Sequence, residues 1–343
     1  MLGGSVFLGR AVVAEALAAG HTVTVFNRGI SAAGAASKPE GVRQLRGDRT
    51  VQADLDQLRE HRYDLVVDTC GYVPTVVGLS VAALEPVAGH YSFVSSVNAF
   101  PGWPEQADYH AGGVHDGDPD AAEAPPGIDD AGAYGWLKVG CERAAERAFG
   151  AARTTILRAG CIVGPHDSVA ARLPWWIDRV FRGGEVLVPG DPRDPVSLID
   201  ARDLAQFALL RAPGVFETTG PHRRDTRSDL MTACLTATAA TVRSVGRELA
   251  DLVYLDDAWL AAQDVQAWTE IPLWVSAGEG PSVWEHDPSA AAAAGLRWRP
   301  LTETVADTWA WQNAIADGWQ PSSRTPGLDP TRERNLIEAW RSR

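Results

Sequence analysis

The sequence is short of cationic residues and of long apolar runs, and each shortage excludes a class of protein. Its 343 residues include 31 Lys and Arg against 44 Asp and Glu, which gives a net charge of −13 at pH 7. Phosphate backbones and anionic headgroups repel such a chain, so we expect no nucleic-acid partner and no membrane partner. No apolar run approaches the roughly 18 residues that span a bilayer, and no signal peptide precedes the first glycines.

Cysteine is also scarce. The four cysteines lie far apart in the sequence, at Cys70, Cys141, Cys161 and Cys234. They form no CxxC pair and no Cys/His spacing suited to zinc, so we expect no metal site. Isolated thiols of this kind are typical of a reducing compartment, and we predict a cytoplasmic enzyme.

Short apolar runs alternate with helical patterns through the first half of the chain. Helices are predicted over 9–19, 74–86 and 135–149, and strands over 21–26, 63–68, 89–95 and 154–157. Apolar strands of this type are usual in a parallel sheet that is covered on both faces. The alternation therefore predicts the α/β class with a doubly wound parallel sheet.

A glycine-rich motif begins almost at the first residue. The run GGSVFLGR at 3–10 directly precedes the first predicted helix. Glycine lets backbone amides approach a pyrophosphate closely, and a helix N-terminus stabilises its negative charge. Only Met1 and Leu2 precede Gly3, whereas a first strand normally has about five residues. We therefore expect that either the central strand is a stub or the true start of the chain lies upstream of Met1, and that any residues before Met1 would extend this strand.

Eight motifs in a fixed order make the chain resemble the short-chain dehydrogenase/reductase superfamily, in its extended or atypical branch, which is epimerase/dehydratase-like. They are GGSVFLGR (3–10), FNRG (26–29), GDR (47–49), DTCGY (68–72), FVSS (93–96), YGWLK (134–138), LRAGCIVGPHD (157–167) and VSLIDARDLA (196–205). The resemblance runs from residue 3 to about residue 311. One position departs from the pattern, because Val6 stands where the family usually has its middle glycine.

The resemblance implies a division into two parts. Residues 1–165 would form an NADP-binding Rossmann core, and residues 166–343 a smaller C-terminal substrate-binding region. The chain would return to the core near 196–212 and end in a Trp-rich tail, since nine of the thirteen tryptophans follow position 258. Residues 101–133 are rich in Gly, Pro and Asp and are predicted to form a long loop, in which His110 and His115 are expected to be solvated.

The resemblance also implies a nicotinamide site. Its expected cofactor contacts are Gly3, Ser5, Val6, Phe7, Leu8, Asn27, Arg28, Asp48, Arg49, Cys70, Gly71, Lys138, Cys161 and Val163. An acidic residue at the end of the second strand would bind a ribose 2′-hydroxyl and repel a 2′-phosphate. Here Asn27 is neutral and Arg28 is cationic, which suits a 2′-phosphate, so we predict NADP(H).

Ser96, Tyr134 and Lys138 occupy the family's catalytic positions. A free phenol has a pKa of about 10, and a nearby ammonium lowers it by stabilising the phenolate. Tyr134 and Lys138 are spaced i, i+4 near the start of a predicted helix, so they share one face. Ser96 ends a strand and can polarise a carbonyl oxygen. If the loop before it displaces Tyr134, the proton could instead come from water or from an acidic phenol on the substrate.

Three functions remain open at this stage. The first is an NADPH-dependent ketoreductase for a large apolar or aromatic, polyketide-like ketone, with substrate contacts from Asn98, Trp103, His166, Trp175 and Trp176. The composition is typical of high-GC actinobacterial genes, in which such reductases often serve secondary metabolism. The second is a sugar-nucleotide epimerase or dehydratase with retained NAD, although no carboxylate follows Ser96 as in sugar 4,6-dehydratases. The third is a non-catalytic cofactor-sensing or RNA-associated protein.

Overall fold

The chain divides into two compact units, which are described separately. The computed structural model describes residues 1–30, 41–104, 110–275, 281–316 and 318–343. Unit 1 comprises Met1–Ile162, Ala201–Gly220 and His286–Arg297, and unit 2 comprises Val163–Asp200, Pro221–Glu285 and Trp298–Arg343. The segment that rejoins unit 1 is therefore 201–220, where the sequence suggested 196–212. The stretch 286–297 also joins unit 1, whereas the sequence predicts it in the substrate-binding region.

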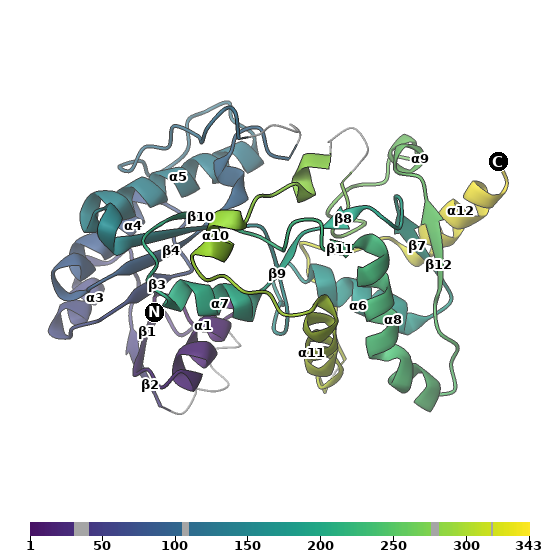
Figure 1. The fold of residues 1–343 in the computed structure, drawn as a ribbon, viewed down its shortest axis with the longest axis horizontal. Helices are drawn as coiled ribbons and strands as arrows, with labels where there is room; N and C mark the ends of the chain where they lie inside the picture. Colours follow the sequence, from purple (N-terminus) through teal and green to yellow (C-terminus); the bar gives the residue numbers. More distant parts are fainter. Residues whose placement is uncertain (31–40, 105–109, 276–280, 317) are drawn as a thin grey trace. The chain divides into compact units, whose positions relative to one another are not determined.

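The centre of unit 1 is a parallel β-sheet (Figure 1). Its strands are β1 (Val23–Asn27), β2 (Val42–Arg46), β3 (Val66–Asp68), β4 (Tyr91–Ser96), β5 (Thr154–Ala159) and β10 (Gly214–Thr218). The pairs β1–β2, β3–β4, β4–β5 and β5–β10 are all parallel. Leu2 bridges Phe26 on one side and Asp68 on the other, which joins β1 to β3. The order β2–β1–Leu2–β3–β4–β5–β10 confirms the predicted Rossmann-like α/β fold.

Met1 and Leu2 lie between β1 and β3, at the centre of this sheet. The Phe26 N–H donates to the Met1 carbonyl at 2.9 Å, and the Leu2 N–H donates to the Val67 carbonyl at 2.9 Å. Leu2 is almost fully buried. The short central strand expected from the sequence is thus present as a pair of isolated bridges.

Helices cover both faces of the sheet. On one face, α1 (Phe7–Ala18) packs with α7 (Ala201–Leu209) over an apolar cluster that includes Val13, Val25 and Val42. On the other, α3 (Gln52–Asp56), α4 (Pro74–Leu84) and α5 (Asp130–Phe149) pack over a larger cluster. Burial of apolar surface on both faces fits the fully buried strands β3 and β4.

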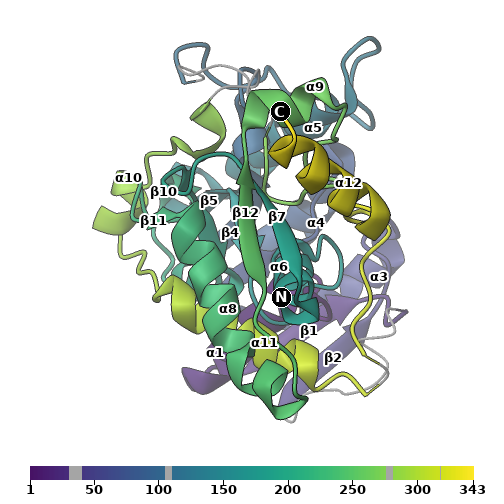
Figure 2. The same cartoon turned by 90° about the vertical axis from the view of Figure 1, so that its right-hand side faces the viewer.

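Unit 2 contains a parallel pair of strands covered by helices. The strands β7 (Glu185–Pro189) and β12 (Asp251–Leu255) lie side by side, and α12 (Pro330–Arg341) contacts both (Figure 2). In its interior, the Arg179 guanidinium pairs with Glu333 at 2.8 Å. Trp175 and Trp176 are 3% and 1% exposed, and the Trp176 indole N–H donates to the Pro272 carbonyl at 2.6 Å. These two tryptophans therefore form part of the core of unit 2.

The remaining elements are short or lie outside the central sheet. They are β6 (Cys161–Val163), α6 (Arg172–Arg182), β8 (Pro195–Val196), β9 (Leu198–Asp200), β11 (Asp225–Thr226), α8 (Arg227–Ser244), α9 (Asp257–Ala262), α10 (Ser289–Ala293) and α11 (Leu301–Asn313). Short 3₁₀ helices are η1 (Gln57–Glu60), η2 (Glu85–Val87), η3 (Val97–Ala99), η4 (Ala151–Arg153) and η5 (Pro281–Trp284). In the part of the chain that the structure describes, no helix is both long and apolar enough to cross a bilayer.

Candidate active site

The glycine turn lies between the central bridge and the first helix. Gly3 and Gly4 have φ values of 96° and 90°, a region that L side chains rarely adopt. A Cβ on Gly9 would lie 2.8 Å from the Gly4 backbone nitrogen, so only glycine lets α1 pack this closely on the turn. The helix has no side-chain cap and no acidic residue in its first turn. Its first backbone N–H groups therefore suit an anion such as a pyrophosphate.

The position that departs from the family pattern is accommodated locally. Val6 has φ −132° and ψ 141°, an extended conformation that any residue adopts. The left-handed conformation falls instead on Phe7, at φ 37°. The turn therefore forms with a valine at the middle-glycine position, and it is Phe7, the next residue, that has the unfavourable positive φ. Ser5 lies in the same turn, and Leu8 is buried beneath it.

At the end of β1, Asn27 is hydrogen-bonded within the protein, whereas Arg28 is exposed to solvent. The Asn27 amide donates to the Gly3 carbonyl at 2.8 Å, and its oxygen accepts from the Gly29 N–H at 3.1 Å. Asn27 therefore fixes the end of β1 to the glycine turn. Arg28 is exposed, and the Asp48 carboxylate accepts from the Thr50 N–H at 2.9 Å. Hydrogen bonds from the Thr50 N–H and the Thr50 hydroxyl, and more weakly the charge of Arg28, lower the pKa of Asp48.

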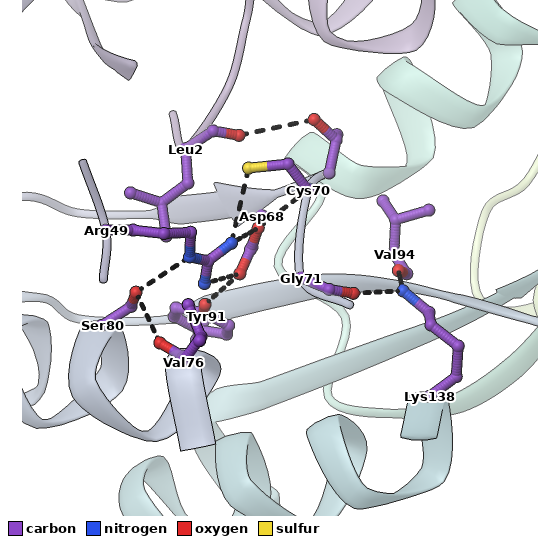
Figure 3. A network of polar contacts seen from close by, with 11 residues as sticks. Leu2, Arg49, Asp68, Cys70, Gly71, Val76, Ser80, Tyr91, Val94 and Lys138 are labelled. Carbon is purple, nitrogen blue, oxygen red and sulfur yellow. Dashed lines mark hydrogen bonds and ion pairs between the residues drawn. The ribbon is translucent and has the colours of Figure 1, made fainter. Parts of the chain in front are cut away.

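Arg49 takes part in a buried polar network rather than pointing to solvent (Figure 3). Its guanidinium forms a bidentate pair with Asp68, at 2.9 and 2.7 Å, and its Nε donates to Ser80 at 3.1 Å. The Tyr91 hydroxyl donates to the same carboxylate at 2.7 Å. Burial raises the pKa of Asp68, but the charge and hydrogen bonds of Arg49 and the bond from Tyr91 bring it below its usual value. The guanidinium that we expected to contact the cofactor is thus committed to Asp68.

Cys70 and Gly71 connect this network to the glycine turn. A Cβ on Gly3 would lie 3.5 Å from the Cys70 sulfur, which places the thiol directly against the turn. Burial raises the pKa of Cys70 to about 11, so the thiol is protonated at neutral pH. A Cβ on Gly71 would lie 2.5 Å from the Phe93 ring, which explains the glycine at this position.

Ser96 and the start of α5 meet after β4. The Ser96 hydroxyl donates to the Asn98 side-chain oxygen at 2.9 Å, and the Asn98 N–H donates back to Ser96 at 3.2 Å. A Cβ on Gly135 would lie 1.9 Å from the Asn98 carbonyl oxygen, so α5 packs directly on the segment after Ser96. Asp129 caps α5 by accepting from the Gly132 N–H at 2.7 Å. The helix therefore begins four residues before Tyr134.

Lys138 is buried, with 3% exposure, and most of its hydrogen-bonding capacity is used. Its ammonium donates to the Gly71 carbonyl at 2.8 Å and to the Val94 carbonyl at 2.6 Å. It also lies 4.3 Å from the centre of the Phe93 ring. Burial lowers the pKa of Lys138. Figure 3 shows that Lys138 and Arg49 approach the segment at Cys70 and Gly71 from opposite sides.

One tyrosine lies close to this ammonium, and another precedes Lys138 on the same helix. Tyr134 is 37% exposed and precedes Lys138 by one helical turn. Tyr72 belongs to the DTCGY motif, and its ring centre lies 5.4 Å from the Lys138 nitrogen. Burial raises the pKa of Tyr72, and the charge of Lys138 partly offsets this. The sequence does not predict this contact, because nothing in the motif indicates that Tyr72 lies near Lys138.

The remaining predicted contacts fall in different units. Trp103 lies in unit 1, on the segment that follows Ser96 and Asn98. Cys161 is buried at the end of unit 1, whereas Val163 and His166 belong to unit 2. The His166 ring lies 5.4 Å from that of Trp311. Trp175 and Trp176, which the sequence predicts as substrate contacts, are instead buried in the core of unit 2.

The prediction of no metal site can be compared with the arrangement of potential ligand side chains. Among the described residues, no group of three or more His, Cys, Asp or Glu side chains is arranged to hold a metal ion.

Comparisons with known proteins agree with this geometry. Residues 1–223 match the family described as the NAD dependent epimerase/dehydratase family. A search of curated proteins gave no match. Among solved structures, the chain is similar to WbmH of Bordetella bronchiseptica in complex with NAD⁺, with 17% identity, coverage of 92% of this chain and 97% of that one, and a TM-score of 0.62.

Two further structures show the same fold. The UDP-glucose 4-epimerase of Thermus thermophilus, complexed with NAD, is 17% identical, with coverage of 92% and 98% and a TM-score of 0.57. The UDP-glucose 4-epimerase of Thermotoga maritima, with UDP-glucose, is 18% identical, with coverage of 90% and 96% and a TM-score of 0.57. At these identities the likeness establishes the fold and leaves the substrate open.

Proposed function

Since the chain belongs to the NAD dependent epimerase/dehydratase family, a branch of the short-chain dehydrogenase/reductase superfamily, we propose that it is an NADP(H)-dependent reductase of a carbonyl compound. The observation that carries the cofactor choice is the end of β1. Asn27 is held by the glycine turn, and the next residue is the exposed Arg28. An arginine there attracts a 2′-phosphate, whereas a carboxylate would repel it.

The residues present fit a dinucleotide. The glycine turn and the uncapped start of α1 offer backbone N–H groups to the pyrophosphate. When bound, the reduced nicotinamide supplies a hydride to the carbonyl carbon. We propose that the Ser96 hydroxyl turns from the Asn98 side-chain oxygen to the carbonyl oxygen and polarises it by hydrogen bonding. Tyr134, or an acidic phenol on the substrate, then gives the alkoxide its proton.

Lys138 has a defined part in this proposal. Two of its three N–H groups are directed to the Gly71 and Val94 carbonyls, which fixes the ammonium between β3 and β4. Its remaining N–H and its charge are then available to stabilise a phenolate or to bind the cofactor ribose. Burial lowers the pKa of Lys138, because it disfavours the charged ammonium.

The proposed substrate is a large apolar or aromatic, polyketide-like ketone. Trp103 supports this class, because it follows Ser96 closely in the sequence and its side chain is half-buried, whereas Phe100 is buried. Aromatic walls bind flat ligands through stacking.

A sugar-nucleotide epimerase is the second candidate. The family match and the similar UDP-glucose 4-epimerases favour it. Such an enzyme retains its NAD through the reaction, so it needs no 2′-phosphate contact. The exposed Arg28 is the feature that makes us prefer the reductase.

The two candidates differ in a measurement on the purified protein. We expect a protein that is isolated largely without nicotinamide and that oxidises added NADPH when 1-tetralone is supplied. Tightly retained NAD⁺, together with interconversion of UDP-glucose and UDP-galactose, would instead establish the epimerase. Absence of nicotinamide binding would reject both and favour a non-catalytic protein on this fold.

A further inference from the structure

Tyr72 is an exposed residue in contact with the buried Lys138 ammonium. The centre of its ring lies 5.4 Å from the Lys138 nitrogen, and the centre of the Phe93 ring lies 4.3 Å from the same atom. Phe93 is fully buried, whereas Tyr72 is 56% exposed. The ammonium therefore contacts one aromatic ring in the core and one that a ligand can reach.

The same ammonium fixes the backbone beside Tyr72. Lys138 donates to the carbonyl of Gly71, the residue before Tyr72, at 2.8 Å, and to the Val94 carbonyl at 2.6 Å (Figure 3). Val94 precedes Ser96 by two residues on β4, which pairs in parallel with β3. The segment that carries Tyr72 and the end of β4 are thus tied to one nitrogen atom at the carboxyl edge of the sheet, where ligands of this fold bind.

The Tyr72 hydroxyl is not committed to another group of the protein. It forms no hydrogen bond within the part of the chain that the structure describes, whereas the Ser96 hydroxyl donates to the Asn98 side-chain oxygen at 2.9 Å. A phenol beside an ammonium is also a strong donor, because the positive charge stabilises negative charge on the phenol oxygen. Tyr72 can therefore donate to a ligand without breaking an existing hydrogen bond.

The chemistry of Tyr72 and Lys138 together indicates which ligand atom they suit. An ammonium has three N–H groups, and backbone carbonyls use two of those of Lys138. A phenol and a charged N–H, both as donors, suit an oxygen that carries negative charge. In a carbonyl reduction, this is the oxygen that becomes an alkoxide when hydride reaches the carbonyl carbon.

We propose that Tyr72 is a further catalytic residue, whose hydroxyl donates a hydrogen bond to the substrate oxygen as this oxygen becomes an alkoxide. This inference rests on the proposed reductase function and adds a donor to it. Tyr72 keeps its proton: the hydride goes to the carbonyl carbon, the C–O π electrons go to the oxygen, and Tyr134 or a substrate phenol supplies the proton of the alcohol. Because the hydrogen bond is stronger to an alkoxide than to a neutral ketone, it acts mainly on the chemical step.

Tyr72→Phe tests the proposal in the full-length protein, because it keeps the ring and removes only the hydroxyl. Tyr63→Phe is the matched control, since Tyr63 is a partly buried tyrosine of the same unit that packs against the larger apolar cluster. With NADPH and 1-tetralone, we expect Tyr72→Phe to lower kcat by about 10- to 150-fold, the range for a hydrogen bond to a charged oxygen. The KM for NADPH should stay within about threefold of wild type, and Tyr63→Phe should keep both values.

Binding measures the same contact without turnover. Calorimetry in the presence of NADP⁺ gives the dissociation constants of 1-tetralone and of tetralin, which has the same ring system without the oxygen. We expect Tyr72→Phe to bind 1-tetralone more weakly by about 2- to 10-fold, the range for a hydrogen bond to a neutral acceptor, and to bind tetralin as the wild type does. Tyr63→Phe should bind both probes with wild-type affinity.

A spectroscopic measurement checks that the Tyr72 ring contacts the ammonium in solution. Lys38 and Lys138 are the lysines of the sequence, so labelling with [ε-¹³C]lysine gives one side-chain signal for each, which Lys38→Arg assigns. Aromatic rings shift the NMR signals of nuclei that lie close to them. We expect the Lys138 signal to move in Tyr72→Leu, which removes the ring, and to stay near its wild-type position in Tyr72→Phe and Tyr63→Phe.

The outcomes distinguish this inference from the proposed function. The inference is overturned if Tyr72→Phe reduces 1-tetralone with kcat within about threefold of wild type, if it loses NADP⁺ affinity instead of kcat, or if the Lys138 signal does not move in Tyr72→Leu. A wild type that reduces no ketone, and whose 1-tetralone affinity is absent or unchanged in Tyr72→Phe, also overturns it. A wild type that reduces no ketone but loses 1-tetralone affinity in Tyr72→Phe supports the contact and rejects the reductase function.

Discussion

Replacement of Arg49 by methionine separates a structural role from a cofactor-binding role. The change keeps an apolar stem of similar length but leaves the fully buried Asp68 carboxylate without its bidentate partner. Breaking a buried ion pair in this way costs about 3–5 kcal/mol, because the remaining charge stays uncompensated. Tyr91 and the Cys70 N–H still donate to Asp68, which favours the lower end of this range.

The expected result is a large loss of stability with little change in binding. For a unit of this size, a loss of about 3–5 kcal/mol lowers Tm by about 6–20 °C. The double variant Arg49→Met/Asp68→Asn should recover part of that loss, since it removes the orphaned charge. Arg62→Met, at an exposed arginine of the same unit, is the control. Thermal unfolding by circular dichroism gives Tm, and calorimetry well below Tm gives the NADP⁺ affinity. A variant with wild-type Tm and NADP⁺ binding weakened tenfold or more would refute the structural role.

Three other predictions concern the same unit. Tyr134→Phe should lower kcat for 1-tetralone by about 10²–10⁴-fold with little effect on the KM for NADPH, and kcat within threefold of wild type would point to a proton from the substrate or water. Iodoacetamide at pH 7.5 should not label Cys70 or Cys141 in the native protein, because burial raises their pKa values to about 11 and 12; peptide mass spectrometry measures this, and rapid native labelling would contradict it. The pKa of Asp68 is depressed on folding, so its stabilising contribution is present above pH about 4 and is lost as the pH falls further. The stability difference between wild type and Asp68→Asn should therefore narrow below pH 4 in urea titrations, and a constant difference would argue against an ionised Asp68.

The strands of the central sheet and the helices that cover it could be predicted where the apolar pattern of the sequence is clear. Buried β3 and β4 are short apolar runs, and each lies within its predicted range to within one residue. The strand β2 gave no such signal, since only Val42 of its five residues is buried. The helix α5 begins at Asp130 rather than 135 because the Asp129 cap precedes a stretch of small residues without apolar periodicity.

Site residues were predictable where backbone chemistry demands a residue type, and less so where side chains pair over long range. The glycine turn belongs to the first kind. Arg49 belongs to the second, because the motif that contains it says nothing of its partner Asp68, nineteen positions away. His110 was expected to be solvated, yet it pairs with Glu217, from which it is separated by 107 positions. Contacts of this kind arise only when the sheet brings distant loops to one edge.

The central claim, that this chain uses NADP(H) through Arg28, is tested most directly by one calorimetric comparison. NADP⁺ and NAD⁺ are titrated into the wild type, into Arg28→Ala and into the control Arg62→Ala. We expect the wild type to bind NADP⁺ more tightly than NAD⁺ by about 10- to 100-fold, the range for a charge-assisted hydrogen bond to phosphate. Arg28→Ala should lose this preference and Arg62→Ala should keep it. Equal affinity for the two cofactors, unchanged in Arg28→Ala, would contradict the account.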